Sequence, residues 1–413
     1  MDNTPMFGAV INRTIPSQIS WDTSRLFKRI CLVTLQTGVT GLVLLFGVLP
    51  LIFRYSESMQ RYAVFLNFIQ WPRRYLLTNP ERLGLDGARQ IYLKVHSNVT
   101  GKPLKLGVWH ILPSMYKNWS STYVRNSSTD GLVIEDEGSA AASLKDTTFD
   151  ALLAKGDRPI ILYAHGNANN RGCLHRVELY KRLQDLNFHV VAFDYRSYGD
   201  STRMRLTELG VVEDTILVYN WILERLGQKH HRKLNTPVFF WGHSLGTGIT
   251  NHALAVLANN GLDSGIVIPN AQPAGLILES PFNNFHEELQ GHILGKMYSW
   301  IPWFHWSIVD PVVNSGFHFK SDEHIATFAA PVLILHARGD RVVPYELGEK
   351  LYEAALSKRP KGFGPVEMVT FPQSDNLGHK NIYTAARLPD IIRNFVDQHS
   401  TDQNSQKLSV HSE

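Results

Sequence analysis

The hydrophobic positions of this chain form two different patterns. Residues 30–53 are a run of 24 uncharged, mostly apolar residues, bounded by Lys28-Arg29 and by Arg54. At a rise of ~1.5 Å per residue, a helix of this length crosses a hydrocarbon core of ~30 Å. A buried core helix is one alternative. A cleaved signal peptide is another, but its apolar core is shorter and ends at a small-residue cleavage site. We therefore expect a retained transmembrane signal-anchor helix over 30–53, after an N-terminal tail over 1–29.

From residue 90 onward, short apolar runs alternate with stretches of helical periodicity, which is typical of an α/β fold. Gln90–Ser97 and Leu104–Leu112 predict an antiparallel pair of strands. Fully apolar runs such as Pro159–Ala164 predict buried strands of a parallel sheet, because helices cover both faces of such a sheet. Further strands are expected at His189–Phe193, Val238–Trp241, Ala274–Leu278, Val332–Leu335 and Glu367–Phe371, with helices near 171–186, over 212–223 and from Pro389.

These patterns predict one globular domain over residues 90–398. Residues 54–89 are expected to be a juxtamembrane linker, and the polar residues 399–413 a disordered tail. Within the domain, the polar stretch 114–157 predicts an insertion or a flexible linker. Tyr62–Trp71 is apolar and aromatic but too short to span a membrane, so it either lies in the membrane interface or packs against the domain.

Composition narrows the class of protein without naming a chemistry. The chain is 44% hydrophobic and 19% charged, with a formal net charge of +4, as in an ordinary globular protein. The sequence has no basic run or basic–aromatic repeat, so no nucleic-acid partner is expected. Cys31 lies in the apolar run and Cys173 in the globular domain, and both are expected to be free thiols. Two cysteines build no metal site, so neither a metal nor a cofactor is predicted.

The strongest chemical signal is the segment Gly242-His-Ser244-Leu-Gly246, which follows an apolar strand and precedes the helical run Ile249–Leu257. In a nucleophile elbow, a strand turns so tightly into a helix that the flanking positions must be small and the serine is held in strained backbone geometry. The alternative is a glycine-rich turn with a solvent-facing serine. The strand–turn–helix context favours Ser244 as a nucleophile.

An elbow serine needs an acid and a histidine later in the chain. Asp340 follows the strand at 332–335, and His379 lies between the last strand and the last helix. Loops at the carboxyl ends of parallel strands meet at one edge of a sheet, so we expect a triad of Ser244, His379 and Asp340 there. Glu279 and Asp375 are the rival acids. His165 and His243 lie near the site and are expected to support its loops.

Two backbone N–H groups are expected to form the oxyanion hole. One belongs to Leu245, the residue after the nucleophile. The other comes from His165-Gly166-Asn167-Ala168, which follows the first parallel strand, with Asn167 as the expected donor. Such donors stabilise a tetrahedral intermediate by ~3–4 kcal/mol each.

Charge and glycosylation sequons indicate which side of the membrane the domain faces. Basic residues are somewhat more frequent before the apolar run than after it, which favours a cytosolic N-terminus. Three sequons follow the run, at Asn98, Asn118 and Asn126, and are candidates for glycosylation. A further sequon at Asn12 would lie in the cytosol and remain unused. The globular domain is therefore expected to face the lumen or the cell exterior.

The region from about 90 to 398 resembles the membrane-anchored α/β-hydrolases of the lysophosphatidylserine lipase and monoacylglycerol lipase family. The matching stretches are Leu162-Tyr-Ala-His-Gly-Asn, His175-Arg-Val-Glu-Leu-Tyr-Lys, Phe193-Asp-Tyr-Arg-Ser-Tyr-Gly-Asp-Ser, Trp241-Gly-His-Ser-Leu-Gly-Thr-Gly, Leu278-Glu-Ser-Pro-Phe and Leu333-Ile-Leu-His-Ala.

This resemblance implies an α/β-hydrolase fold in an endoplasmic-reticulum membrane protein with a lumenal active site. It implies that the enzyme hydrolyses the acyl ester of lysophospholipids and monoacylglycerols through Ser244, Asp340 and His379. In acyltransferase relatives an aspartate follows the histidine by five residues, whereas here Thr384 does, which favours hydrolysis. The loop Ala337-Arg-Gly-Asp keeps the aspartate but is less acidic than the family pattern, so the charge around Asp340 is expected to differ from that in the family.

In this family a lid occupies the position of residues 283–328. The segment holds three tryptophans within seven residues, Trp300 to Trp306. Three interpretations are open: these tryptophans line an acyl-chain pocket, touch the membrane or form an aromatic mini-core.

The alternatives for the function of the whole chain are a membrane peptidase, a hydrolase of another ester or thioester, and a non-catalytic scaffold. A peptidase of the propeller type needs more chain before the first parallel strand, and a scaffold usually lacks a triad residue. The head group of the substrate stays open.

Overall fold

The computed structural model describes residues 23–117, 137–227, 236–261, 264–269 and 271–409. The chain divides into two compact units, Met1–Ile52 and Phe53–Glu413, which are described separately here. The sequon residues Asn118 and Asn126 lie outside the described residues, whereas Asn98 is exposed in the turn between the first two strands. Cys31 and Cys173 are both free thiols.

The N-terminal apolar run is helical throughout. α1 (Thr23–Val43), the π-helical turn η1 (Leu44–Val48) and α2 (Leu49–Tyr55) follow one another without a break. The most apolar 18-residue stretch within residues 24–55 has a mean hydropathy of 2.0, and none of this stretch is buried. The hydroxyls of Thr34 and Thr37 donate to the carbonyls of Ile30 and Val33, both at 2.8 Å, so these polar groups are satisfied within the helix. The helix is long and apolar enough to cross a membrane, as predicted.

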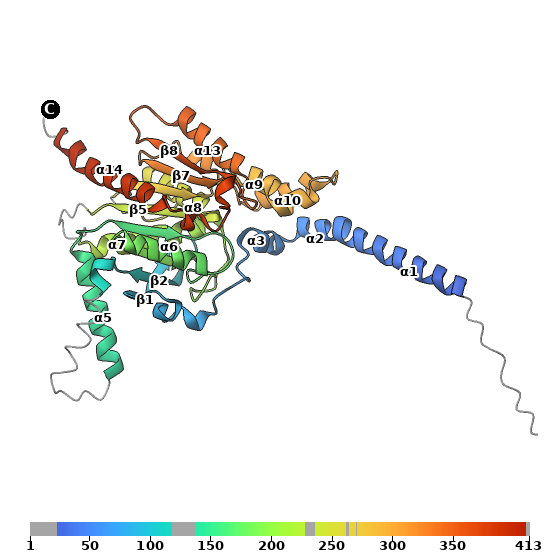
Figure 1. Cartoon of the computed structure of the whole chain (residues 1–413), viewed down its shortest axis with the longest axis horizontal. Helices are drawn as coiled ribbons and strands as arrows, with labels where there is room; N and C mark the ends of the chain where they lie inside the picture. Colours follow the sequence, from blue (N-terminus) through green and yellow to red (C-terminus); the bar gives the residue numbers. More distant parts are fainter. Residues whose placement is uncertain (1–22, 118–136, 228–235, 262–263, 270, 410–413) are drawn as a thin grey trace, which may run out of the picture. The chain divides into compact units, whose positions relative to one another are not determined.

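The second unit is built on one eight-stranded sheet (Figure 1). Its strands are ordered β1-β2-β4-β3-β5-β6-β7-β8, and only β2 runs antiparallel to its neighbours. Every residue of β3, β4, β5, β6 and β7 is buried, which explains their unbroken apolar sequences. The strands are β1 (Ala88–Ser97), β2 (Lys102–Ile111), β3 (Ile160–Ala164), β4 (His189–Asp194), β5 (Val238–His243), β6 (Gly275–Glu279), β7 (Val332–Ala337) and β8 (Val366–Phe371).

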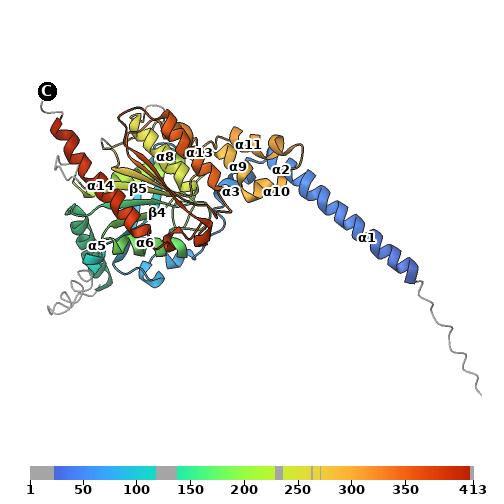
Figure 2. The same cartoon turned by 45° about the horizontal axis from the view of Figure 1, so that its top comes forward.

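Helices cover both faces of the sheet (Figure 2). Alternate residues of β3 divide between two cores, with Ile160 and Leu162 in one and Ile161 and Tyr163 in the other, as the period of a strand requires. The first core is completed by α7 (Glu208–Arg225), α8 (Leu245–Ala258) and α13 (Tyr345–Lys358), and the second by α6 (Leu174–Asp185) and α14 (Leu388–Ser409). This arrangement is the predicted α/β-hydrolase fold.

A chain of short helices lies between β6 and β7, at the predicted lid position. They are α9 (Phe285–Gly291), α10 (Ile293–Tyr298), the π-helical turn η6 (His305–Val309), α11 (Asp310–Asn314) and α12 (Ser321–His324). α9 is tied to the body of the unit because Lys350 of α13 pairs with Glu287. The remaining short turns of 3-10 helix are η2 (Arg74–Leu76), η3 (Pro80–Leu83), η4 (Ser114–Tyr116), η7 (Gln373–Asp375) and η8 (Ile382–Thr384).

The expected juxtamembrane linker is instead part of the folded unit. α3 (Glu57–Phe65) buries Val64 and Phe65, and Leu77 and Leu85 are fully buried in the core. Within the segment 62–71, the carbonyls of Phe65 and Ile69 accept hydrogen bonds from the loop after β3. The segment therefore packs against the domain. The prediction of a linker over 54–89 was wrong because the apolar residues of this stretch are spread over short helices and turns, without a sustained helical or strand period.

Two further boundaries differ from prediction. Part of the stretch 114–157 is the helix α5 (Glu137–Ala154), which buries Phe149 and is fastened by the ion pair of Arg89 with Asp150; residues 118–136 lie outside the described part. At the C-terminus α14 continues to Ser409, and His399 is buried against Phe395 with ring centroids 4.8 Å apart. The domain thus extends past residue 398, into residues expected to be disordered.

Candidate active site

Ser244 lies in the turn that joins β5 to α8. Its backbone angles, φ 54° and ψ −121°, fall in a region that residues with a side chain rarely occupy. Such a conformation costs of order 1–3 kcal/mol and persists only where the surrounding structure imposes it. A strained turn therefore lies at Ser244, where the nucleophile elbow is expected.

The two glycines of the motif are explained by close backbone approaches. A Cβ atom on Gly242 would lie 2.4 Å from the carbonyl oxygen of Gly246, and one on Gly246 would lie 2.1 Å from the carbonyl oxygen of Ala164. A Cβ on Gly166 would lie 3.0 Å from the Cβ of Ser244. The turn after β3 and the elbow thus press against each other, and only glycine fits at the first two positions.

His379 and Asp340 meet as predicted, although they are 39 residues apart in the chain. The Nδ1 atom of His379 lies 2.8 Å from Oδ2 of Asp340. Because an ionised carboxylate only accepts hydrogen bonds, Nδ1 carries the proton and Nε2 is left as a base. The other carboxylate oxygen accepts the backbone N–H groups of Val342 and Val343 at 2.8 and 3.0 Å. These bonds fix the orientation of the Asp340 side chain.

The protonation state of Asp340 suits this role. Burial acts to raise its pKa, but hydrogen bonds from His336 and His379 outweigh burial, and the pKa of Asp340 lies well below its ordinary value. The carboxylate therefore stays ionised at neutral pH.

The two rival acids have other partners. Glu279 is buried and accepts a hydrogen bond from the indole nitrogen of Trp241 at 3.0 Å. Burial raises the pKa of Glu279 to about 7. Asp375 is exposed, and its side-chain hydrogen bond comes from the adjacent Ser374 at 3.4 Å. Asp340 is thus the carboxylate that holds the histidine.

His243 connects the elbow to the loop of His379. Its Nε2 lies 2.8 Å from the carbonyl oxygen of His379, and the two rings are 4.9 Å apart between centroids. Burial, together with the neighbouring imidazole of His379, holds the pKa of His243 well below its ordinary value. A neutral ring must carry its proton on Nε2 to donate to this carbonyl. Ser244, the next residue, is thereby fixed to the loop that carries the histidine.

Buried charges shape the loop after β3, and sequence analysis missed them. Asp194, the last residue of β4, accepts the backbone N–H of Arg171 at 2.7 Å and pairs with its guanidinium. Burial acts to raise the pKa of Asp194, but the charge of Arg171 outweighs it and the pKa is lowered. Arg176 donates to the carbonyls of Asn170 and Ala168 at 2.7 and 3.0 Å. The only signal in the sequence is Asp194, a charged residue at the end of an apolar strand.

The predicted oxyanion donors have no protein acceptor in the described part of the chain. The residues next to them do have acceptors. The N–H of Ser244 donates to the backbone carbonyl of Glu279 at 2.9 Å, and the N–H of Ala168 donates to the backbone carbonyl of Phe65 at 3.1 Å. The backbone N–H groups of Leu245 and Asn167 make no such bond. These two groups belong to the two turns that touch at Gly166 and Ser244, so both are available for an anion there.

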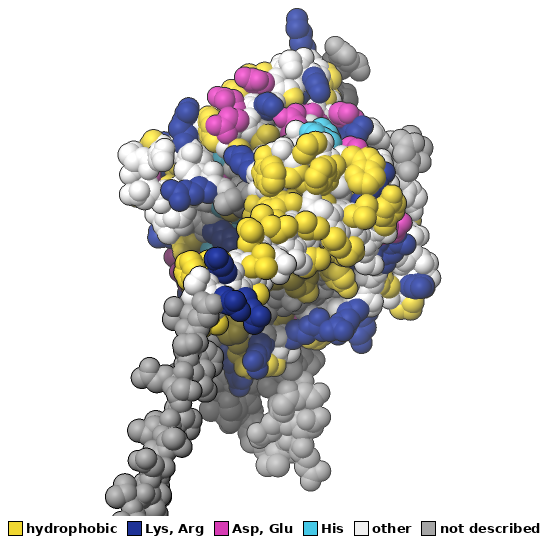
Figure 3. Space-filling view, turned by 90° about the vertical axis from the view of Figure 1, so that its right-hand side faces the viewer, with side chains coloured by type: hydrophobic (Ala, Val, Ile, Leu, Met, Phe, Trp, Pro, Cys, Tyr) yellow, Lys and Arg dark blue, Asp and Glu magenta, His cyan; other side chains and the backbone are white. Residues whose placement is uncertain are grey.

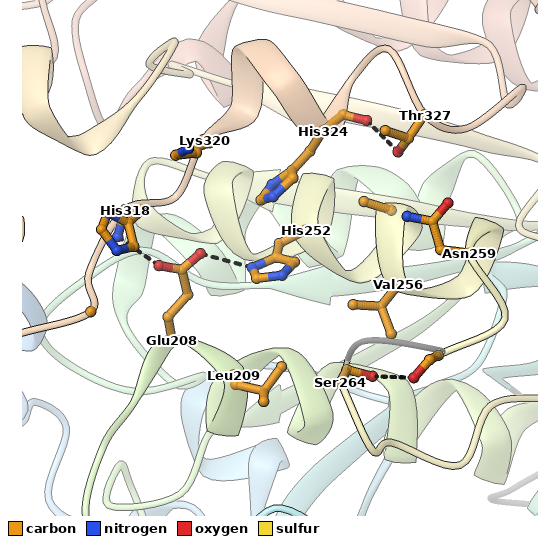
Figure 4. Close-up of a pocket in the computed structure, with 13 residues that line it drawn as sticks. Glu208, Leu209, His252, Val256, Asn259, Ser264, His318, Lys320, His324 and Thr327 are labelled. Atoms are coloured by element: carbon orange, nitrogen blue, oxygen red, sulfur yellow. Dashed lines mark hydrogen bonds and ion pairs between the residues drawn. The ribbon is translucent and has the colours of Figure 1, made fainter.

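A separate hollow lies between α7, α8 and the end of the lid segment (Figure 4). Its volume is about 430 Å³, and none of the predicted site residues lines it. Glu208 accepts from Nδ1 of His252 and from the backbone N–H of His318, both at 2.7 Å. Burial lowers the pKa of the neighbouring His324 to about 3. Both carboxylate oxygens of Glu208 accept hydrogen bonds within the protein. Glu208 thereby joins α7 to α8 through His252 and to the end of the lid segment through His318.

Among the described residues, no group of three or more His, Cys, Asp and Glu side chains is arranged to hold a metal ion.

Comparison with known proteins identifies the family. Residues 161–384 match the model of the alpha/beta hydrolase family. Lysophosphatidylserine lipase ABHD12 of Danio rerio is 35% identical over 358 residues, covering 86% of this chain and 82% of that protein. The protein of the same name from Rattus norvegicus is 37% identical over 348 residues, covering 84% and 76%. Protein ABHD12B of Homo sapiens is 33% identical over 335 residues, covering 81% and 79%. The chain therefore belongs to the alpha/beta hydrolase family.

Proposed function

We propose that this chain is a membrane-anchored serine hydrolase that cleaves the acyl ester of lysophospholipids, lysophosphatidylserine above all, and of monoacylglycerols. The observation that carries the proposal is the hydrogen bond between His379 and Asp340, on loops at the sheet edge where the strained Ser244 emerges. The relatives named as lysophosphatidylserine lipases support the substrate class.

The catalytic cycle has two halves. In the first, Nε2 of His379 takes the proton of the Ser244 hydroxyl while Oγ attacks the ester carbonyl carbon. The tetrahedral intermediate collapses, His379 returns the proton to the leaving alcohol, and the acyl group stays on Ser244. In the second half, water loses its proton to His379 and attacks the acyl-enzyme, which releases the fatty acid and restores the serine. Asp340 stabilises the imidazolium form in both halves.

The oxyanion hole in this proposal consists of the backbone N–H groups of Leu245 and Asn167. Support comes from the free state of both donors and from the close contact of their two turns. Because the loop of Asn167 is held by buried ion pairs, its donor needs little reorganisation during the reaction.

The proposed location is the endoplasmic-reticulum membrane, with residues 1–29 in the cytosol and the hydrolase unit in the lumen. The apolar helix 24–55 supports a membrane span. The excess of basic residues before the uncharged run 30–53 supports the orientation, and the exposure of the Asn98 sequon is compatible with it.

The test compares wild type, Ser244→Ala and the matched control Ser357→Ala, a serine exposed on α13, each purified in detergent. Fatty-acid release is measured from lysophosphatidylserine, lysophosphatidylcholine and monoacylglycerol. We expect wild type and S357A to release fatty acid and S244A to lose all but a trace. If wild type hydrolyses none of the three substrates yet reacts with a fluorophosphonate at Ser244, the substrate class is wrong. No reaction from folded protein would overturn the enzyme itself.

A further inference from the structure

The lid carries a group of large aromatic side chains on the outside of the protein. Trp300 is 67% exposed, and Trp303 and Trp306 are also exposed. Tryptophan is costly to leave in water but suits a boundary where one end of the ring is apolar and the other wet. Figure 3 shows hydrophobic side chains gathered on one side of the molecule, with Lys and Arg around them. We call these three residues the lid aromatics.

A second aromatic group belongs to the segment 62–71. Tyr62 is exposed, and Phe68 and Trp71 are 64% and 63% exposed. The backbone of this segment is nevertheless fixed, because the N–H of Asn169 donates to the carbonyl of Ile69 at 2.6 Å. We call these three residues the segment aromatics. They are held in place against the loop that carries the proposed oxyanion donor, so their exposure is not a consequence of a loose chain.

Both groups are attached to the residues that follow the apolar helix. The guanidinium of Arg54 lies 4.1 Å from the centroid of the Trp306 ring and donates to the Trp306 carbonyl. Further along, the ring of Phe65 packs edge-on against Phe317, which lies between α11 and α12 of the lid segment, with 5.4 Å between the ring centroids. Arg54 comes directly after the uncharged run, so in a membrane it marks the depth at which the chain leaves the hydrocarbon. A lid residue bound to Arg54 lies at that same depth.

Exposed basic residues accompany the segment aromatics. Arg73 and Arg74 are exposed next to Trp71. Tryptophan and tyrosine are enriched where proteins meet lipid head groups, and basic residues there are attracted to anionic lipid. Because Trp306 is bound to Arg54, at the end of the uncharged run, a bilayer surface fits this group of side chains better than a protein partner.

From these observations we propose that the lid aromatics and the segment aromatics are seated in the head-group layer of the bilayer that the N-terminal helix crosses. The bilayer occupies this face of the hydrolase unit. Given the proposed function, a single-tailed lipid then reaches Ser244 from the membrane rather than from water.

The first measurement is of tryptophan fluorescence in full-length protein reconstituted into phosphatidylcholine bilayers that contain a minor fraction of phosphatidylserine. Lipids brominated near the top of the acyl chain quench tryptophans that lie close to the head groups. We expect wild type to be quenched and Trp300→Phe/Trp303→Phe to lose part of this quenching, because Trp71 and Trp306 remain. Equal quenching of wild type and the double variant, or none in either, overturns the proposal. So does protection of the emission from a water-soluble quencher without quenching by bromine, which would indicate a protein partner.

The second measurement is of turnover by Trp300→Ser/Trp303→Ser on lysophosphatidylserine in vesicles and on a water-soluble short-chain ester. We expect kcat/KM to fall about tenfold on the vesicle substrate and to stay unchanged on the soluble ester. Leu356→Ser, which replaces an exposed leucine of α13, is the matched control and should change neither. An equal fall on both substrates would mean that the tryptophans line the acyl pocket, which overturns the proposal. Quenching does not depend on turnover, so it tests the bilayer contact even if the proposed substrate class fails.

Discussion

His243 donates a hydrogen bond to the backbone carbonyl of His379, with 2.8 Å between the two atoms. The residue before the proposed nucleophile thus holds the loop of the proposed base. This link is independent of Asp340, which holds the imidazole ring itself. His379 is consequently fixed at both its backbone and its side chain.

We expect His243→Leu to lower kcat by about tenfold or more, because the loop of His379 loses a buried hydrogen bond worth about 1–2 kcal/mol. KM should change little, since His243 is a positioning residue. His243→Gln, whose amide N–H can make the same bond, should recover most of the rate. Steady-state kinetics on a short-chain ester decide the point, and a folded H243L with an unchanged kcat would contradict it.

Asp340→Asn should lower kcat by about 10³–10⁴-fold, because an amide holds the imidazole in the wrong tautomer and does not stabilise its cation. Asp375→Asn, which changes the rival acid, is the control and should leave kcat near that of wild type. The reverse ranking of the two variants would assign the acid to Asp375.

The pKa of Asp340 is lower in the folded protein than its ordinary value. Its ionisation therefore contributes stability that is present at neutral pH and lost as pH falls below about 4. We expect the free energy of unfolding of wild type to approach that of D340N as the solution is acidified through that range. Urea unfolding at a series of pH values measures this, and a difference that does not depend on pH would refute it.

Glu279 predicts the opposite pH dependence. Its pKa is raised from 4.5 to about 7 by burial, so the folded state binds this proton more tightly than the unfolded state. Stability is then complete below about 4.5 and is lost as pH rises toward 7, by an amount on the order of 3 kcal/mol. Glu279→Gln keeps an acceptor for Trp241 and removes the titration. We expect E279Q to be more stable than wild type at pH 8 but not at pH 4, as read from thermal unfolding.

Gly246→Ala should destabilise the unit by about 3 kcal/mol or more, because the added Cβ would lie 2.1 Å from the Ala164 carbonyl and the backbone would have to move. Gly378→Ala is the matched control, since its nearest neighbour would be 3.6 Å away. Denaturant midpoints of the two variants should differ clearly. Similar midpoints would mean that the contact at Gly246 relaxes at little cost.

Elements could be predicted from the sequence where the interactions that stabilise them are local in the chain. β3 was predictable because every residue is buried and apolar, and the elbow was predictable because Gly242 and Gly246 are required by close backbone approaches. α5 was missed because few apolar residues, such as Phe149, mark its buried side. The pair of Asp194 and Arg171 was missed because the two residues meet only when β3 and β4 lie side by side.

The contact between the turn at Gly166 and the turn at Ser244 separates two kinds of change in this protein. The close approach of these turns leaves no room for a side chain at Gly242 or Gly246, and it does not depend on which side chains the lid carries. Substitutions on the lid can then alter which lipids are admitted without disturbing the chemistry. Proteins that keep these few glycines can therefore differ in the lipid that they hydrolyse and still share one catalytic geometry.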